Sequence, residues 1–158
     1  MRTLIAWLML LGSVARADSS VPGSGGGAGA PMVSLERTAC YGRCPIYKVT
    51  VLRDGTVLWE GERFVKVTGK ARGKLDDKAL AALADAFKAA DFFALKDKYE
   101  SYDITDHPSA VVAFDDGKRK KTVRHYHGDR SAPKAMYELE DAVDRIVGTA
   151  KWVGRDPR

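Results

Sequence analysis

The stretch IYKVTVLRDGTVLWE, residues 46–60, decides the fold, because it holds two runs of β-branched and aromatic residues on either side of Asp54-Gly55. Such runs favour strands, and Asp-Gly between them is the strongest short-range signal for a hairpin, since both turn positions need positive φ. A two-residue turn would place Thr50 opposite Trp59 on one face. The stretch therefore predicts an antiparallel hairpin with apolar residues on both faces.

Four more strands are expected from β-rich or alternating runs over residues 32–38, 64–68, 110–114 and 118–126. The last two of these runs flank Asp116-Gly117, which predicts a second tight hairpin.

Two amphipathic helices are expected as well. The first begins at the capping residue Asp76 and ends near Asp91, and its apolar stripe consists of Leu80, Leu83, Ala84 and Phe87. The second follows Ser131 and Pro133 and stops at Gly148, and its apolar stripe consists of Met136, Leu139, Val143 and Ile146.

These elements predict an α+β fold, in the order ββββ-α-ββ-α. Strands joined by tight hairpins are antiparallel, and two amphipathic helices have enough apolar surface to cover one face of a sheet. We therefore expect a single antiparallel sheet with both helices packed on one face. The other face would carry an exposed apolar patch, unless a loop such as residues 92–102 covers it.

The N-terminal region has the features of an export signal. Arg2 precedes the apolar run of residues 4–11, and Ala15-Arg16-Ala17 offers small residues for cleavage, so residues 1–17 are predicted to be a signal peptide. The apolar run is far shorter than the roughly 20 residues of a membrane-spanning helix. Residues 18–31 are predicted to be a flexible Gly/Ser/Ala/Pro linker, residues 32–154 a single domain and residues 155–158 a tail.

The charge pattern permits a surface that faces anions. The formal net charge of +5 falls to +3 without Arg2 and Arg16. Basic residues gather in residues 63–74 and again in residues 118–124. The chain has no Asn or Gln and no recognised nucleic-acid motif, which argues against nucleic acid as the partner.

Both cysteines lie in TACYGRCPIY, residues 38–47. In an exported protein, Cys40 and Cys44 favour one disulfide. An extended chain would hold their α-carbons about 13 Å apart, so the stretch must turn, and Gly42 allows this. The alternative is a reactive dithiol, with Arg43 favouring the thiolate. The Cys-x3-Cys-Pro spacing also resembles copper chaperones, but there it opens a helix, whereas the residues that follow here favour a strand.

The three histidines suggest a second alternative. His125 and His127 are two apart on a predicted strand, so both imidazoles could face one metal ion, with His107 or Asp106 completing the site. The competing interpretation is an ordinary exposed strand end, where Arg124 and Arg130 would repel a cation. The chain contains no Gly-x-Ser-x-Gly, phosphate-binding loop or His-Glu-x-x-His motif, so we expect a protein that is not an enzyme.

The cysteine stretch also carries a resemblance to a known family. Its pattern Thr38-x-Cys40-Tyr41-Gly42-x-Cys44-Pro45-x-Tyr47 is supported by Asp54-Gly55-Thr56-Val57, Gly61-x-Arg63-Phe64-Val65 and Ala90-Asp91-Phe92-Phe93-x-Leu95. With these motifs, residues 33–152 resemble an exported bacterial domain family of unknown function. The resemblance implies a bacterial envelope or secreted setting, and it supplies no activity or catalytic residue.

The sequence thus predicts a periplasmic or secreted, non-enzymatic binding module without a cofactor, stapled by Cys40 and Cys44. The candidate binding surface consists of Tyr41, Arg43, Trp59, Lys118, Lys120 and Arg124. Its partner would be an envelope or extracellular protein or an anionic polymer. The alternative is a thiol-disulfide redox protein at Cys40 and Cys44, or a metal-binding protein at His107, His125 and His127.

Overall fold

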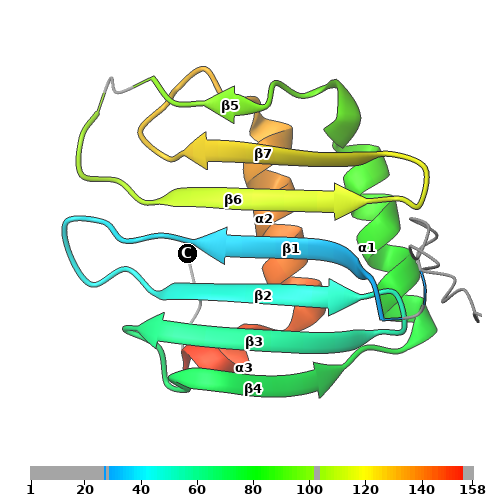
Figure 1. Ribbon diagram of the computed structural model, residues 1–158. Helices are drawn as coiled ribbons and strands as arrows, with labels where there is room; N and C mark the ends of the chain where they lie inside the picture. The colour runs from blue at the N-terminus through cyan, green and yellow to red at the C-terminus, as the bar shows by residue number, and fades with distance from the viewer. Residues whose placement is uncertain (1–26, 28, 102–103, 155–158) are drawn as a thin grey trace, which may run out of the picture.

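The computed structural model describes residues 27, 29–101 and 104–154. The predicted signal peptide, most of the predicted linker and the predicted tail lie outside these residues. Within the described part of the chain, no helix is long and apolar enough to cross a membrane. Seven strands form one sheet, and the helices all lie on one of its faces (Figure 1).

The elements follow the predicted order, with three short additions. They are β1 (Pro31–Arg37), β2 (Ile46–Leu52), β3 (Thr56–Arg63), β4 (Gly69–Lys74), α1 (Asp77–Ala89), the 3-10 turn η1 (Phe92–Ala94), β5 (Lys98–Tyr99), β6 (Ser109–Asp115), β7 (Lys120–Tyr126), α2 (Lys134–Val147) and α3 (Ala150–Val153). The strand order across the sheet is β4-β3-β2-β1-β6-β7-β5. The α+β class is confirmed, but the sheet is mixed, because β5 pairs with β7 in parallel.

The first hairpin forms, but its register differs from the prediction by one residue. Three residues rather than two connect β2 to β3, and the last of them, Gly55, has a φ of 84°. Trp59 therefore pairs with Val49, and Thr50 pairs with Leu58. Because side chains alternate across a strand, this shift moves Trp59 onto the face that the helices cover. The predicted pairing of Thr50 with Trp59 is wrong for that reason.

The predicted strand over residues 64–68 is also wrong. The N–H groups of Lys66 and Val67 donate to carbonyl groups at the end of α3, at 3.1 and 2.9 Å, and not to a neighbouring strand. The next segment, β4, takes the place beside β3 instead. Its sequence, GKARGK, consists mostly of residues with low strand propensity, so its strand character comes from pairing with β3.

The two long helices begin and end largely as predicted. Asp76 caps α1 by accepting a hydrogen bond from the N–H of Ala79 at 2.8 Å, and α2 stops at Gly148, whose φ is 72°. Two carboxylates of α2, Glu140 and Asp144, are buried beside its apolar residues, which the sequence pattern did not predict. The core lies between these helices and the inward side chains of the sheet, which include Val33, Leu35, Val49, Val51, Val57, Val112 and Val123.

Aspartates in the two hairpin turns make stability depend on pH. Asp116 accepts hydrogen bonds from the N–H groups of Arg119 and Lys118, at 2.7 and 2.8 Å, and these bonds hold its pKa below the ordinary value. A carboxylate with a lowered pKa stabilises the fold at neutral pH, and this contribution disappears as the pH falls below about 4. We expect Asp116→Asn to be less stable than the wild type at pH 7, and the difference to shrink as the pH falls through the lowered pKa of Asp116.

Denaturant unfolding of both proteins at several pH values measures this difference. If the gap between wild type and Asp116→Asn stays constant down to acid pH, the charge of Asp116 does not stabilise the turn. Asp54 in the first hairpin makes a matching arrangement, since it accepts from the N–H of Thr56 at 2.8 Å and its pKa is likewise lowered.

Candidate functional site

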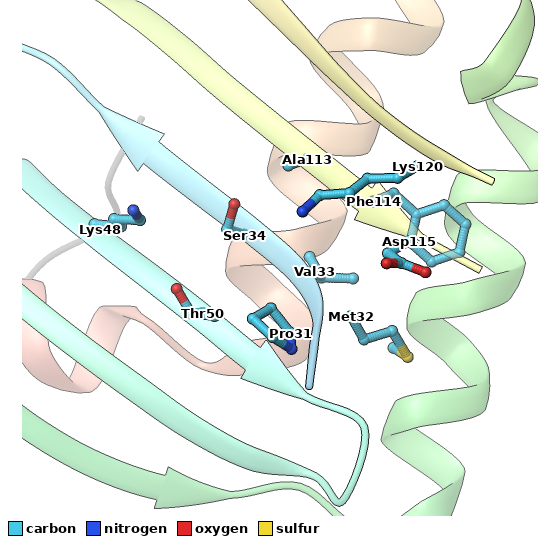
Figure 2. Close-up of a pocket in the computed structure, with 10 residues that line it drawn as sticks. All are labelled: Pro31, Met32, Val33, Ser34, Lys48, Thr50, Ala113, Phe114, Asp115 and Lys120. Carbon is cyan, nitrogen blue, oxygen red and sulfur yellow. The ribbon is translucent and has the colours of Figure 1, made fainter. Parts of the chain in front are cut away.

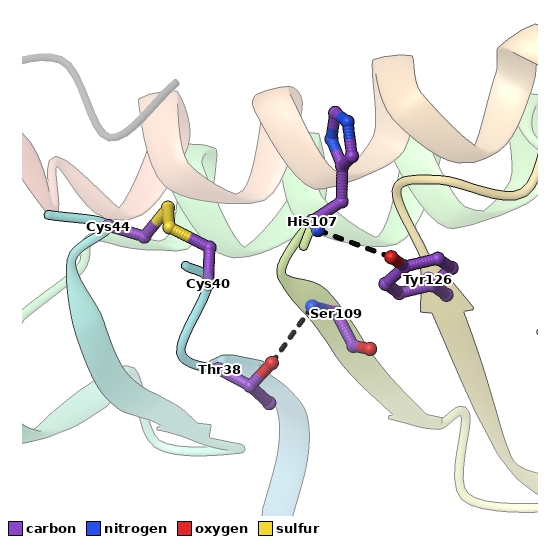
Figure 3. The surroundings of a disulfide bond; sticks show 6 residues. All are labelled: Thr38, Cys40, Cys44, His107, Ser109 and Tyr126. Carbon is purple, nitrogen blue, oxygen red and sulfur yellow. Dashed lines mark hydrogen bonds between the residues drawn. A yellow bond between two sulfur atoms is a disulfide. The ribbon is translucent and has the colours of Figure 1, made fainter. Parts of the chain in front are cut away.

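The loop between β1 and β2, residues 38–45, is closed by a disulfide, and we refer to it as the stapled loop. Cys40 and Cys44 are bonded, with their α-carbons 5.8 Å apart, which confirms the predicted bridge (Figure 3). The N–H of Ser109 donates to the hydroxyl of Thr38 at 2.8 Å, and the N–H of Tyr41 donates to the carbonyl of Asp106 at 3.1 Å. The loop is thus held both by the covalent bridge and by the segment that leads into β6.

The stapled loop presents Tyr41 to solvent. This side chain is 89% exposed, and it is the one large hydrophobic residue that is exposed among the described residues. Arg43 also lies at the surface, with its guanidinium 5.3 Å from the centre of the Phe64 ring. Arg63, at the end of β3, approaches the same ring at 5.0 Å. One end of the sheet therefore combines an exposed phenol with two arginines.

The other predicted surface residues do not join this group. Trp59 is 1% exposed and stacks between Tyr47 and Trp152, with ring centres 4.7 and 5.2 Å away, so its assignment to a binding surface is wrong. Lys118 and Lys120 lie at the β6–β7 hairpin, at the opposite end of the strands from the stapled loop (Figure 1).

Arg124, the remaining predicted surface residue, lies in β7 and pairs with Glu100 at 2.8 Å. The two basic segments seen in the sequence also lie apart. Residues 63–74 include β4, and residues 118–124 include most of β7. These two strands lie near opposite edges of the sheet.

The face of the sheet without helices mixes polar and half-buried apolar side chains, and no large hydrophobic residue of the described strands is fully exposed on it, so the predicted exposed apolar patch is absent there. A hollow of about 210 Å³ opens on it between β1, β2, β6 and β7. Polar and apolar residues line it in equal number: Ser34, Lys48, Thr50, Asp115 and Lys120, and Pro31, Met32, Val33, Ala113 and Phe114 (Figure 2). The register shift places the largest apolar side chain of this hairpin, Trp59, on the covered face, and it leaves Leu52 and Leu58 half-buried on the open face. The segment of residues 92–101 does not cover the open face either, since β5 extends the sheet beside β7.

A polar network is buried between the sheet and α2. Arg37 donates to Asp144 Oδ2 through Nε at 2.9 Å and Nη2 at 2.7 Å, and its Nη1 lies 3.4 Å from Glu140 Oε2. The hydroxyls of Tyr47 and Thr149 donate to Asp144 Oδ1 at 2.6 and 2.7 Å. Burial and the charge of Asp144 raise the pKa of Tyr47, so its phenol stays protonated and remains a donor.

Two histidines contact the same network, and with Glu140 they form what we call the histidine cluster. His125 Nδ1 lies 2.6 Å from Glu140 Oε1, and His127 Nε2 lies 2.7 Å from Glu140 Oε2. The expectation that both imidazoles face the same side is confirmed by their ring centres, 4.8 Å apart. The structure places Glu140, rather than His107 or Asp106, beside them.

His107 belongs to a different part of the surface. Its side chain is exposed, and its backbone N–H donates to the hydroxyl of Tyr126 at 3.2 Å, near the stapled loop (Figure 3). The metal-site hypothesis from the sequence therefore named two residues of the cluster, His125 and His127. Its third residue, His107 or Asp106, lies elsewhere, and Glu140 takes that position.

The charge state of Glu140 follows from its surroundings. Burial raises its pKa, but hydrogen bonds from His125 and His127 and the charge of Arg37 outweigh burial, so the pKa lies below the ordinary value. An ionised carboxylate only accepts hydrogen bonds, so each imidazole nitrogen that faces Glu140 carries a proton. In the described residues, one guanidinium thus faces two buried carboxylates, Glu140 and Asp144.

The sequence held faint signals for this network. Arg37 follows Val33 and Leu35 at inward positions of β1, which places a charge where the alternation calls for an apolar residue. Glu140 and Asp144 are four residues apart on α2 and flank Leu139 and Val143, so they share the buried face. Charged residues at the margin of an apolar stripe are ordinarily solvated, which is why these were missed.

Residues 31–147 match the model of a family described as a domain of unknown function, DUF6438. The chain belongs to this family. The DUF6438 match spans the whole sheet together with α1 and α2, and it contains the stapled loop and the histidine cluster. No curated protein matches the chain.

Proposed function

We propose that this DUF6438 chain is an exported, non-enzymatic binding module that docks on an envelope or extracellular protein through the stapled loop. The observation that carries the proposal is the exposure of Tyr41, 89%, on a loop that is covalently closed. The helices cover the apolar face of the sheet, so that face is not available to a partner. Among the described residues, an exposed aromatic ring on a fixed loop is therefore the feature most typical of a binding interface.

The chemistry of the loop suits recognition of a protein. Tyrosine supplies a large contact area at low conformational cost, because it has only two side-chain torsions, and it is enriched among residues that dominate binding energy. The disulfide and the hydrogen bonds to residues 106 and 109 fix the loop before binding, which lowers the entropy lost in a complex. Arg43 and Arg63 at the same end favour a partner with carboxylates facing them.

Export rests on separate support. The first 17 residues have the pattern of a signal peptide, and a disulfide persists in oxidising compartments such as the periplasm or the extracellular space. An anionic polymer is the other partner class, and it would engage the basic residues without needing the tyrosine.

Crosslinking in intact cells tests the proposal. A photoreactive phenylalanine analogue in place of Tyr41 is expected to capture an envelope or extracellular protein. The control carries the analogue in place of Lys78, which is exposed on α1 at the end of the sheet away from the stapled loop (Figure 1). With the captured protein purified, Tyr41→Ala is expected to raise the Kd about 30-fold, the equivalent of about 2 kcal/mol for a dominant interface residue.

The double variant Cys40→Ser/Cys44→Ser separates the ring from its support. We expect it to bind more weakly than the wild type but more tightly than Tyr41→Ala, because it keeps the phenol and loses the fixed loop. Equal capture at positions 41 and 78, or no capture at position 41, would contradict the proposal. If the affinity falls as the ionic strength rises but is unchanged by Tyr41→Ala, the partner is an anionic polymer instead.

A further inference from the structure

We propose that the histidine cluster binds a divalent transition-metal ion, with zinc as the best fit, through His125 Nδ1, His127 Nε2 and one oxygen of Glu140. This site is separate from the stapled loop and does not depend on the binding function. One ligand atom from each residue lies within 4.8 Å of the others. The ligands come from the end of β7 and from the middle of α2, so the packing of helix on sheet brings them together.

The ligand set is typical of zinc. Two imidazoles and a carboxylate form a known three-residue zinc site, which leaves a fourth position for water. Bond lengths of about 2.0 to 2.2 Å in a tetrahedral site place ligand atoms about 3.3 Å apart. The nitrogen–oxygen distances here are 2.6 and 2.7 Å, each to a different oxygen of Glu140, and the three ligand atoms lie within 4.8 Å of one another. To admit an ion, the carboxylate must move back and the two imidazoles must come closer together.

Protons occupy these contacts in the absence of an ion. Each imidazole nitrogen that faces Glu140 carries a hydrogen, and the ion would take its place. A neutral ring moves this proton to its other nitrogen, whereas a doubly protonated ring releases one proton to solvent, and in the second case binding becomes stronger as the pH rises.

The local charge favours a cation. Two carboxylates, Glu140 and Asp144, face one guanidinium, Arg37, which leaves one negative charge in excess when both imidazoles are neutral. A zinc ion with a bound hydroxide would offset this charge. Arg37 opposes the ion, since its Nη1 is 3.4 Å from Glu140, but two shorter bonds to Asp144 direct most of its charge elsewhere.

The cluster is also incomplete as a structural hydrogen-bond network. His125 Nε2 is buried and has no hydrogen-bond partner among the described residues. Buried polar atoms in structural networks are nearly always paired, so an unpaired imidazole nitrogen points to another role for the ring. The side chain of His127 is 22% exposed, whereas His125 and Glu140 are buried, so an ion would enter on the side of His127.

Zinc titration of the chelator-treated full-length chain tests the site, with His107→Ala as the matched control. We expect one Zn²⁺ per chain at about 10 µM free zinc, and at least a 10-fold loss of affinity in His127→Ala. His107→Ala should bind as the wild type does, since His107 lies outside the cluster. Co²⁺ in place of zinc should give the intense visible absorption of a tetrahedral site in the wild type and His107→Ala alone.

Histidine ring signals in NMR spectra give a readout that needs no variant. Zinc should shift the signals of His125 and His127 and leave that of His107 in place. No binding at one ion per chain, unchanged affinity in His127→Ala, or loss of binding in His107→Ala would each overturn the proposal. The crosslinking result at Tyr41 bears on none of these outcomes, so the two proposals fail separately.

Discussion

Arg37→Met is expected to lower the free energy of unfolding by about 3 to 5 kcal/mol, the usual effect of removing one partner from a buried ion pair. The guanidinium is buried and forms two bonds to Asp144, at 2.9 and 2.7 Å. Methionine has a similar length but no charge, so the variant keeps most of the packing and leaves Asp144 and Glu140 without their cation.

The neighbouring groups limit how far the network can adapt. Tyr47 and Thr149 still donate to Asp144 after the substitution, but both are neutral. Burial lowers the pKa of Arg37, but the negative charges of Asp144 and Glu140 raise it by more, so the charged form of the guanidinium is stabilised at this position. Without it, we expect Glu140 to take up a proton at higher pH than in the wild type, because Arg37 helps to lower its pKa and an uncompensated buried charge is costly.

Denaturant unfolding of Arg37→Met and Arg124→Met measures the effect. Arg124 is the matched control, because it also lies in a strand and pairs with a carboxylate at 2.8 Å, but its side chain is 45% exposed. An exposed pair contributes about 1 kcal/mol or less, so Arg124→Met should be nearly neutral. If both variants lose the same small amount, the buried network does not stabilise the fold as described.

The network illustrates what the sequence could not show. Periodicity predicted both long helices and correctly placed His125 and His127 on one side, because these are local properties of helix and strand. The contact between His125 and Glu140 joins two elements, so it depends on how α2 crosses the sheet. Local pattern identifies which residues are inward, but not which inward residues meet.

The register of the first hairpin shows a second limit. Asp54-Gly55 correctly marked a turn, yet the same dipeptide can end a three-residue loop, where only the glycine needs positive φ. One extra loop residue reverses the faces of a strand pair, so Trp59 changed from a predicted surface residue to a buried one. The strand β4 was missed for another reason, since pairing with β3 overrides its low intrinsic propensity.

Trp59→Ala provides the sharpest test of that reversal, and it is expected to lower the free energy of unfolding by about 3 to 5 kcal/mol. The ring is 1% exposed and stacks on both Tyr47 and Trp152. Its Nε1–H donates to the carbonyl of Val67 at 2.9 Å. Alanine would leave a cavity beside two aromatic rings and a carbonyl without its donor, so both packing and hydrogen bonding are lost.

The loss should spread to the segment that Trp59 holds. Residues 64–68 reach the end of α3 through the N–H groups of Lys66 and Val67, and the indole fixes the carbonyl of Val67. Amide hydrogen exchange at Lys66 and Val67 is therefore expected to accelerate in Trp59→Ala more than exchange in β6, which lies on the far side of β1. Tyr41→Ala is the control, because an exposed ring contributes within about 0.5 kcal/mol to stability. If Trp59→Ala unfolds like Tyr41→Ala, the indole is not buried as described, and a register that exposes it, such as that of the two-residue turn, would fit better.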